Sequence, residues 1–219
     1  MTLNYTGGYE QAARQVAELE KVGLDVVWVA EAYSFDAPSV MGYLAAKTER
    51  VEIGSAILPI YSRTPTLLAM TAAGLDAILG ADKGFDPRHF LTGARTAYEM
   101  IVVAFAQGDR RTLRDMLSKE VLDGFDQVIR EREGRGETAE TRFVSIDTTE
   151  IAGAELRGRT AQVTVRFVSQ LVSVTRDKTG NVTDGNPDKV TDVTDIWTFA
   201  RDVTSRDPNW KLVATDSGH

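Results

Sequence analysis

The chain has 219 residues, of which 42% are hydrophobic and 26% charged, and its net charge is −7. These values are ordinary for a globular protein, and the acidic balance excludes nucleic acid as the main partner. With no cysteine and only two histidines, disulfides, thiolate metal sites and histidine-rich metal sites are excluded. No apolar run approaches the roughly 20 residues that span a membrane, and the first ten residues do not resemble a signal peptide. We therefore expect a soluble, cytoplasmic chain without a metal site.

The first 78 residues alternate between helical and strand patterns. Helical patterns cover residues 8–22, 39–48 and 66–79. Two short apolar runs, 24–30 and 51–60, predict strands that are buried on both faces, as in a parallel sheet. This order is typical of right-handed crossover units, in which strands and helices alternate.

Glycines and charged residues over 80–83 predict a linker, and long helices follow it. A helix is expected over 89–107, then a short helix capped by Asp109, then a third helix capped by Ser118. The third helix is expected to end at 134–136 and to turn five apolar residues inward. These residues are Val121, Leu122, Phe125, Val128 and Ile129.

From residue 141 the hydrophobic pattern changes to the alternation of β-strands. Strands are predicted over 143–151, 160–175, 193–203 and 210–215. The alternation in the second of them slips at 168–170, which indicates a bulge. Segment 178–189 contains two glycines and a proline, and we expect it to be an exposed hairpin loop. Helices followed by antiparallel strands indicate an α+β domain.

One face of the predicted strands carries large apolar residues that are expected to face the long helix. They are Val163, Val165, Phe167, Trp197 and Phe199 on the strands, with Tyr98 and Phe105 on the helix. Such a set suits a pocket for a lipid tail or an apolar peptide. An ordinary packed core is the alternative, and the pattern of residues alone leaves both interpretations open.

A basic group surrounds the short helix that follows residue 109. It consists of Arg110, Arg111, Arg114 and Lys119. Basic side chains near an acidic lipid surface contribute about 1 kcal/mol each, so these four are candidates for contact with lipid headgroups. The alternative is a solvated helix face, because acidic residues are interspersed among the basic ones.

Two stretches of the first part carry a family resemblance. They are Leu-Asn-Tyr-Thr-Gly-Gly over 3–8 and a continuous stretch over 26–78, which opens Val-Val-Trp-Val-Ala-Glu. These stretches resemble luciferase-like monooxygenases, especially oxidoreductases that depend on the deazaflavin F420. The resemblance implies a (β/α) barrel with F420 or FMN at the strand ends. It places Glu31, Asp36, Gly54 and Ser55 near the cofactor ring.

Compared with the barrels that it resembles, the pattern in this chain is truncated, and its first strand, predicted over 2–5, is clipped. A barrel of this kind needs eight strands and about 250 residues, whereas the pattern here stops after the third unit. A site assembled from many strand ends needs more than three of them. We therefore expect the cofactor site to be vestigial, and we assign no catalytic residue and no bound cofactor.

Residues 84–216 resemble the Tim44-like domain in its alphaproteobacterial form. The resemblance is carried by GFDPRHFLTGARTAYEMIVV, which starts at residue 84, and by DVTDIWTFARDVTSRDPNWKLVATDSG over 192–218. It implies helices packed on a curved antiparallel sheet, related to the NTF2-like fold, with a large apolar pocket. The mitochondrial relatives tether protein-import machinery at the inner membrane and contact acidic lipid.

The sequence therefore predicts a fusion of two unrelated segments, an engineered chimera or a recombined gene. A truncated barrel fragment (1–79) and a linker (80–83) precede a Tim44-like domain (84–219) of the α+β class. The parallel strands of the fragment have open edges, so we expect them to pair with another copy, to pack on the second domain or to remain partly disordered.

The function expected from these features is non-catalytic. The chain is predicted to be a scaffold or adaptor of protein translocation, or of membrane-associated protein handling, that binds an apolar peptide or a lipid. Its expected partners are translocation-machinery proteins and acidic lipid. The alternative is an F420- or flavin-dependent oxidoreductase that completes its barrel by forming a homo-oligomer.

Overall fold

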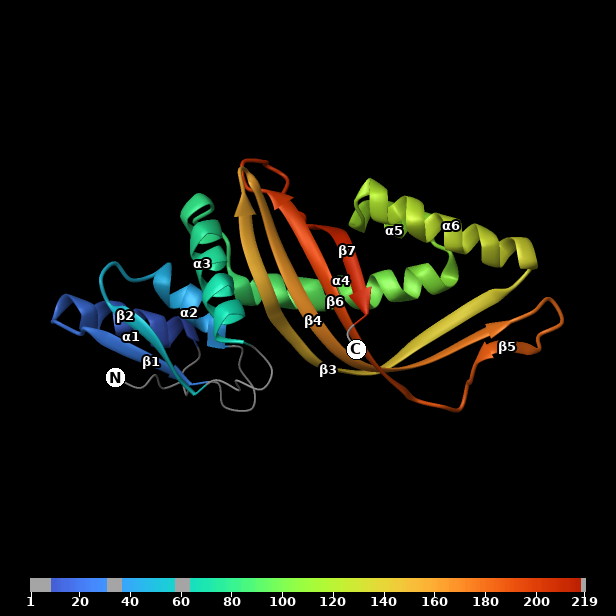
Figure 1. Ribbon diagram of the computed structural model, residues 1–219, viewed down its shortest axis with the longest axis horizontal. Helices are drawn as coiled ribbons and strands as arrows, with labels where there is room; N and C mark the ends of the chain where they lie inside the picture. The colour runs from blue at the N-terminus through green and yellow to red at the C-terminus, as the bar shows by residue number, and fades with distance from the viewer. Residues whose placement is uncertain (1–8, 31–36, 58–63, 218–219) are drawn as a thin grey trace. The chain divides into compact units, whose positions relative to one another are not determined.

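The computed structural model describes residues 9–30, 37–57 and 64–217 (Figure 1). The helices are α1 (Tyr9–Lys21), α2 (Ala37–Ala45), α3 (Pro65–Ala81), α4 (Pro87–Gln107), α5 (Arg110–Met116) and α6 (Lys119–Arg135). The strands are β1 (Val26–Ala30), β2 (Glu52–Ile57), β3 (Thr138–Arg157), β4 (Thr160–Arg176), β5 (Val182–Gly185), β6 (Thr191–Asp202) and β7 (Lys211–Ser217). Over these ranges, no helix combines the length and the apolar character that a membrane crossing requires.

The chain folds into two compact units. Of the described residues, the first unit contains those up to 90 together with 151–163 and 202–204, and the second contains the others. Because the first unit includes the tips of β3 and β4, it combines the N-terminal segment with part of the larger sheet. The mixture of helices and antiparallel strands confirms the predicted α+β class.

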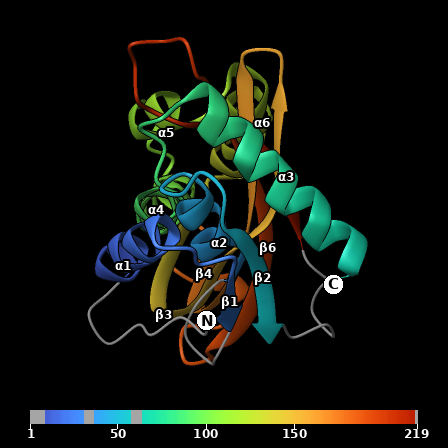
Figure 2. The ribbon, with the colours of Figure 1, turned by 90° about the vertical axis from the view of Figure 1, so that its left-hand side faces the viewer.

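In the first unit, β1 and β2 form a two-stranded parallel sheet. Figure 2 shows these strands side by side, with α1 and α2 next to them. The core between them is built from Ala12, Ala13, Val16, Val27, Val29, Val40 and Leu44. It lies on one face of β1, and Trp28 points to the other face with 45% of its surface exposed. The prediction of strands buried on both faces is therefore wrong, and the predicted strand over 2–5 falls outside the described residues.

Helix α3 packs closely on the tip of β3 within the first unit. Thr64 caps its N-terminus, because the Thr64 side chain accepts a hydrogen bond from the Leu67 N–H. The Thr71 hydroxyl lies 3.5 Å from the carbonyl oxygen of Ala152. Gly74 approaches the Ala154 carbonyl so closely that a Cβ atom would overlap it. The helix ends at Ala81, inside the predicted linker, and the boundary between the two domains stays a prediction.

The larger sheet has the strand order β3-β4-β6-β7, and β5 pairs with β4. Helix α4 packs on it through Tyr98 and Ile101, which are fully buried. Along β4, buried and less buried residues alternate through Ser169, and the alternation slips at Leu171 and Val172. The break in alternation that was predicted at 168–170 therefore lies at 171–172, because the polar residue Ser169 is itself buried.

The predicted exposed loop over 178–189 contains a strand, β5, which pairs with β4 in antiparallel fashion. The turn before β5 is tight because the Asp177 carboxylate accepts hydrogen bonds from the N–H groups of Thr179 and Asn181. The hydrogen bond from the Thr179 hydroxyl, together with these two main-chain bonds, lowers the pKa of Asp177 to about 2. The chain therefore reverses after a few residues and continues as a strand.

Candidate ligand-binding groove

An open groove in the second unit lies between helices α4 and α6 and strands β3, β4 and β5. Its volume is about 490 Å³. The lining includes Phe105, Val128, Arg132, Arg135, Glu137 and Thr141. Apolar surface together with a few charged groups is typical of a site for a ligand that has both an apolar and a polar part.

Phe105 of α4 and Val128 of α6 supply apolar surface to the groove. The Phe105 ring packs on the Phe125 ring with the centroids 4.7 Å apart, which holds it in position. Val128 keeps 49% of its surface exposed, so the prediction that it faces inward is wrong. The same prediction for Ile129 is confirmed, since this residue is fully buried and anchors helix α6. An apolar ligand in the groove would remove the exposed valine surface from water.

Arg132 supplies a positive charge to the same groove. Its Nη2 donates a hydrogen bond of 2.9 Å to the carbonyl oxygen of Phe105, and its guanidinium lies 5.7 Å from the centroid of the Phe105 ring. Burial lowers the pKa of Arg132 below its usual value, but an arginine stays protonated at physiological pH. A partly desolvated guanidinium is a favourable partner for a carboxylate or a phosphate.

The end of α6 shapes one side of the groove. Gly136 ends the helix in the left-handed conformation, with φ at 69°. The Lys178 side chain, from the turn before β5, lies so close over Gly136 that a Cβ atom there would overlap it. The next residue, Glu137, forms an ion pair of 2.8 Å with Arg135. The β4–β5 turn and the end of α6 therefore lie directly against each other.

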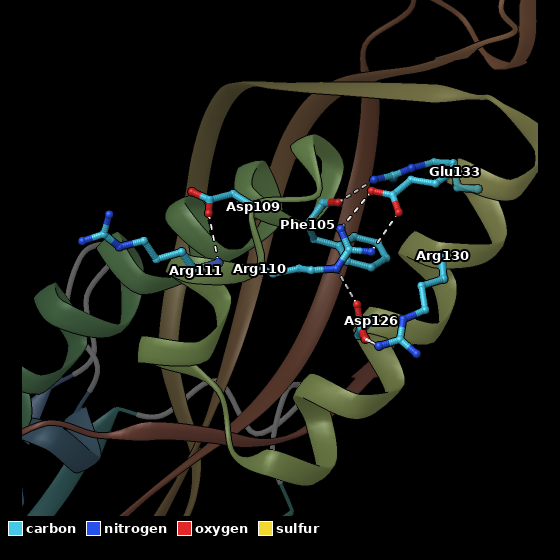
Figure 3. Close-up of polar contacts among 8 residues, drawn as sticks. Phe105, Asp109, Arg110, Arg111, Asp126, Arg130 and Glu133 are labelled. Carbon is cyan, nitrogen blue, oxygen red and sulfur yellow. Dashed lines mark hydrogen bonds and ion pairs between the residues drawn. The ribbon is translucent and has the colours of Figure 1, made fainter.

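An ionic network joins α5 to α6 (Figure 3). Arg110 Nε donates to Asp126 Oδ1 at 2.6 Å, and its two Nη atoms donate to the Glu133 carboxylate at 2.9 Å. The hydrogen bonds to Glu133 and Asp126 raise the pKa of Arg110, and Arg110 lowers the pKa of both carboxyl groups. Bidentate pairing of this kind fixes geometry as well as charge.

We expect Arg110→Gln to lower the midpoint of thermal unfolding, because Asp126 and Glu133 would lose their shared counter-charge. Arg111→Gln is the matched control, since Arg111 is the next residue, is exposed and takes no part in this network. Circular dichroism at low and high salt would measure both midpoints. Equal midpoints for the two variants would show that the network contributes nothing to stability.

The seven residues predicted to line an apolar pocket are largely packed together. Tyr98 stacks on Phe167 with ring centroids 4.3 Å apart and meets Trp197 edge to face at 4.7 Å. Val163, Val165 and Phe199 are also buried, whereas Phe105 lines the groove. Ligand binding by this set stays a prediction.

The predicted headgroup residues have different surroundings. Arg110 is held in the ionic network, whereas Arg111, Arg114 and Lys119 are exposed. Their contact with lipid also stays a prediction.

The structure describes two of the four candidate cofactor residues of the first unit. Glu31 and Asp36 fall outside the described residues, and Gly54 and Ser55 lie in β2. The Trp28 ring covers Gly54, where a Cβ atom would lie 2.5 Å from the indole. No cluster of three or more potential metal-ligating His, Cys, Asp or Glu side chains occurs among the described residues.

Residues 71–217 match the family model of the Tim44-like domain, which covers more than half of the chain. The chain belongs to the Tim44-like domain family. Residues 1–80 match the model of luciferase-like monooxygenases. Both resemblances predicted from the sequence are therefore confirmed, and the two matches overlap within α3.

Curated relatives follow the same division. The mitochondrial import inner membrane translocase subunit TIM44 of Mus musculus is 28% identical over 64% of this chain and 31% of that protein. An uncharacterised protein of Rickettsia prowazekii is 25% identical over 64% of this chain and 56% of its own length. A putative coenzyme F420-dependent oxidoreductase of Mycobacterium tuberculosis is 35% identical over 36% of this chain and 24% of that protein. The chain thus spans about a third of mouse TIM44 and about a quarter of the oxidoreductase.

Among solved structures, the intermembrane space region of the chloroplast protein ARC6 aligns with 57% of this chain and 95% of that chain. The sequence identity is 16% and the TM-score is 0.38.

Sequence reasoning missed the groove residue Arg132, which lies in a run of alternating charges that reads as a solvated helix end. A usable signal was present. Phe125, Val128 and Arg132 follow one another at spacings of three and four, so they share one face of α6. An arginine that continues an apolar helix face is expected to lie beside apolar surface, whereas one on a polar face is expected to point into solvent.

Proposed function

We propose that this chain is a non-catalytic scaffold or adaptor domain of protein translocation that binds an apolar peptide or a lipid tail in the groove beside α6. Membership of the Tim44-like family supports the translocation role, since the mouse relative is named as a subunit of the inner membrane translocase. The same likeness supports an association with translocation-machinery proteins at a membrane.

The observation that carries the proposal is the surface of the groove. Phe105 and Val128 offer apolar area, and 49% of the Val128 surface is exposed. Arg132 places a positive charge next to this area. A ligand with an apolar body and an anionic end would match both features. The exposed residues Arg111, Arg114 and Lys119 would add attraction to an acidic lipid surface.

We expect Val128→Glu to weaken binding at least about tenfold, because a carboxylate would replace apolar area in the groove and stand beside the ligand. Val190→Glu is the matched control, since Val190 is 47% exposed and Val128 49%, and Val190 does not line the groove. Binding would be measured by fluorescence anisotropy with a labelled amphipathic peptide and by flotation with vesicles that contain anionic lipid. Equal binding by the two variants, or no binding of either probe by the wild type, would exclude the groove as the site.

The oxidoreductase alternative has weaker support. It rests on the match over residues 1–80 and on the oxidoreductase of Mycobacterium tuberculosis, of which this chain spans about a quarter. Titration of F420 and FMN into the full chain, followed by fluorescence, separates the two functions. Saturable binding of either cofactor would favour the alternative and count against the adaptor role.

A further inference from the structure

The first half of β3 is an open edge of the larger sheet. The strand order β3-β4-β6-β7 places β3 at one end of the sheet (Figure 1). Further along the strand, the edge is contacted from outside the sheet. Arg95 Nη1 donates a hydrogen bond of 2.7 Å to the carbonyl oxygen of Ile146. The Thr71 hydroxyl lies 3.5 Å from the carbonyl oxygen of Ala152. No hydrogen bond from outside the sheet reaches the main chain of 138–144 within the described ranges.

The side chains on the outer face of this half alternate in a defined pattern. Thr138, Glu140, Arg142 and Val144 are all exposed, and Val144 leaves 48% of its surface in contact with solvent. In the part of the chain that the structure describes, neither Glu140 nor Arg142 takes part in an ion pair. An open strand edge is a template for pairing with another chain unless its charges repel that chain.

The charges on this edge are self-complementary. If a second copy pairs in antiparallel fashion about Thr141, Glu140 stands opposite Arg142 of the other copy, and Arg142 stands opposite its Glu140. Thr138 then stands opposite the exposed Val144. Oppositely charged cross-strand pairs stabilise antiparallel sheets, and a two-fold axis through Thr141 forms each pair twice.

We propose that this chain forms a homodimer by antiparallel pairing of residues 138–144 of β3 about Thr141. The occupant of the edge is a second copy because this register satisfies both charges of each chain with the charges of the other. The pairing is short, so the dimer is weak and weakens further as salt rises. It joins the two larger sheets into one. Since Thr141 also lines the groove, the two grooves of the dimer open beside the shared dyad.

Sedimentation equilibrium on the full chain, from micromolar to submillimolar concentration, tests this proposal. The wild type is expected to dimerise. Glu140→Arg and Arg142→Glu, made singly, are each expected to raise the dissociation constant roughly tenfold or more, because both cross-strand pairs become repulsive. The double variant restores complementarity and dimerises again. Arg206→Glu, an exposed charge reversal outside β3, is the control and leaves the constant unchanged.

A mixture of the two single variants provides a second test of the proposed pairing. The Glu140→Arg chain carries two positive charges on the edge and the Arg142→Glu chain carries two negative charges, so they pair with each other better than with themselves. Circular dichroism would confirm that every variant is folded. A wild type that stays monomeric, single reversals with the affinity of the control, or a mixture that does not associate would each overturn the proposal.

Discussion

Gly74→Ala is expected to destabilise the chain by about 3 kcal/mol, a large effect for the addition of one methyl group. The reason is the close approach of α3 to β3. A Cβ atom on Gly74 would overlap the carbonyl of Ala154, and the main chain next to it would lie within contact distance too. A flexible side chain can move aside, but a main-chain carbonyl in a paired strand cannot do so without displacing the strand. Urea unfolding followed by circular dichroism would measure the change.

Gly80→Ala is the matched control for this experiment. Gly80 lies in the same helix, is exposed, and a Cβ atom there would have no neighbour within 4 Å. Alanine is the better helix former, so this variant is expected to gain about 0.5–1 kcal/mol. If Gly74→Ala behaved like Gly80→Ala, α3 would not pack on β3 in solution.

Gly74 lies in the part of α3 where the two family matches overlap. The two family matches overlap over residues 71–80, within α3. The helix therefore lies at the junction of two segments of different family likeness. Its contacts with α2, among them Leu75 and Leu79 against Gly42, and its contact with β3 fall within one unit. A domain boundary at 80–83 would separate α3 from the strand on which it packs. Chains that begin at residue 64 and at residue 84 would show, by their relative stability, on which side of α3 the boundary falls.

Features set by local chemistry were predictable from the sequence. Asp109 caps α5, Ser118 caps α6, and Gly136 ends α6 in the left-handed conformation. Each of these residues acts on main-chain groups only a few positions away, so its side-chain type is sufficient to reveal its role. The alternation that places Trp197 and Phe199 on the buried face of β6 is likewise a property of the strand itself.

Features set by distant partners were not predictable. Arg110 belongs to a basic helix in the sequence, but its carboxylate partners lie 16 and 23 residues away on α6. Ser169 is a polar residue in an apolar pattern, so the sequence predicts a break in the strand alternation there. Its burial depends on a hydrogen bond with Tyr98, which is 71 residues away in the sequence. Val128 has the spacing of a core residue. Its exposure depends on how α6 is rotated over the sheet, which hydrophobic periodicity resolves only to within about one residue.

Tyr98→Phe is expected to destabilise the chain by about 2 kcal/mol at neutral pH, because a partly buried carboxylate would lose its hydrogen-bond donor. The Tyr98 hydroxyl donates to Asp195 Oδ2 at 2.7 Å and lies 3.1 Å from Ser169 Oγ. Removing one oxygen atom leaves the stacked ring in place, so the aromatic packing is preserved. The loss is therefore polar in origin.

The pH dependence identifies Asp195 as the residue responsible. Burial raises the pKa of Asp195 above its ordinary value of 3.8, although the bond from Tyr98 opposes this shift. Below that ordinary value the carboxyl group is protonated in both the folded and the unfolded chain. As the pH rises through the higher folded-state pKa, the folded chain must hold a partly buried charge and stability is lost. Tyr98→Phe removes the opposing bond, so its cost is expected to be larger at neutral pH than near pH 4.

Asp195→Asn removes the charge and keeps an oxygen that accepts the Tyr98 hydrogen bond. Its stability relative to the wild type is therefore expected to improve between pH 4 and neutral pH, opposite to the trend of Tyr98→Phe. In the double variant, the pH-dependent part of the Tyr98→Phe cost is expected to disappear. Urea unfolding of the wild type, the two single variants and the double variant at both pH values gives the coupling free energy between Tyr98 and Asp195. A Tyr98→Phe cost that is equal at the two pH values would mean that the hydroxyl stabilises the fold through Ser169, independently of the Asp195 charge.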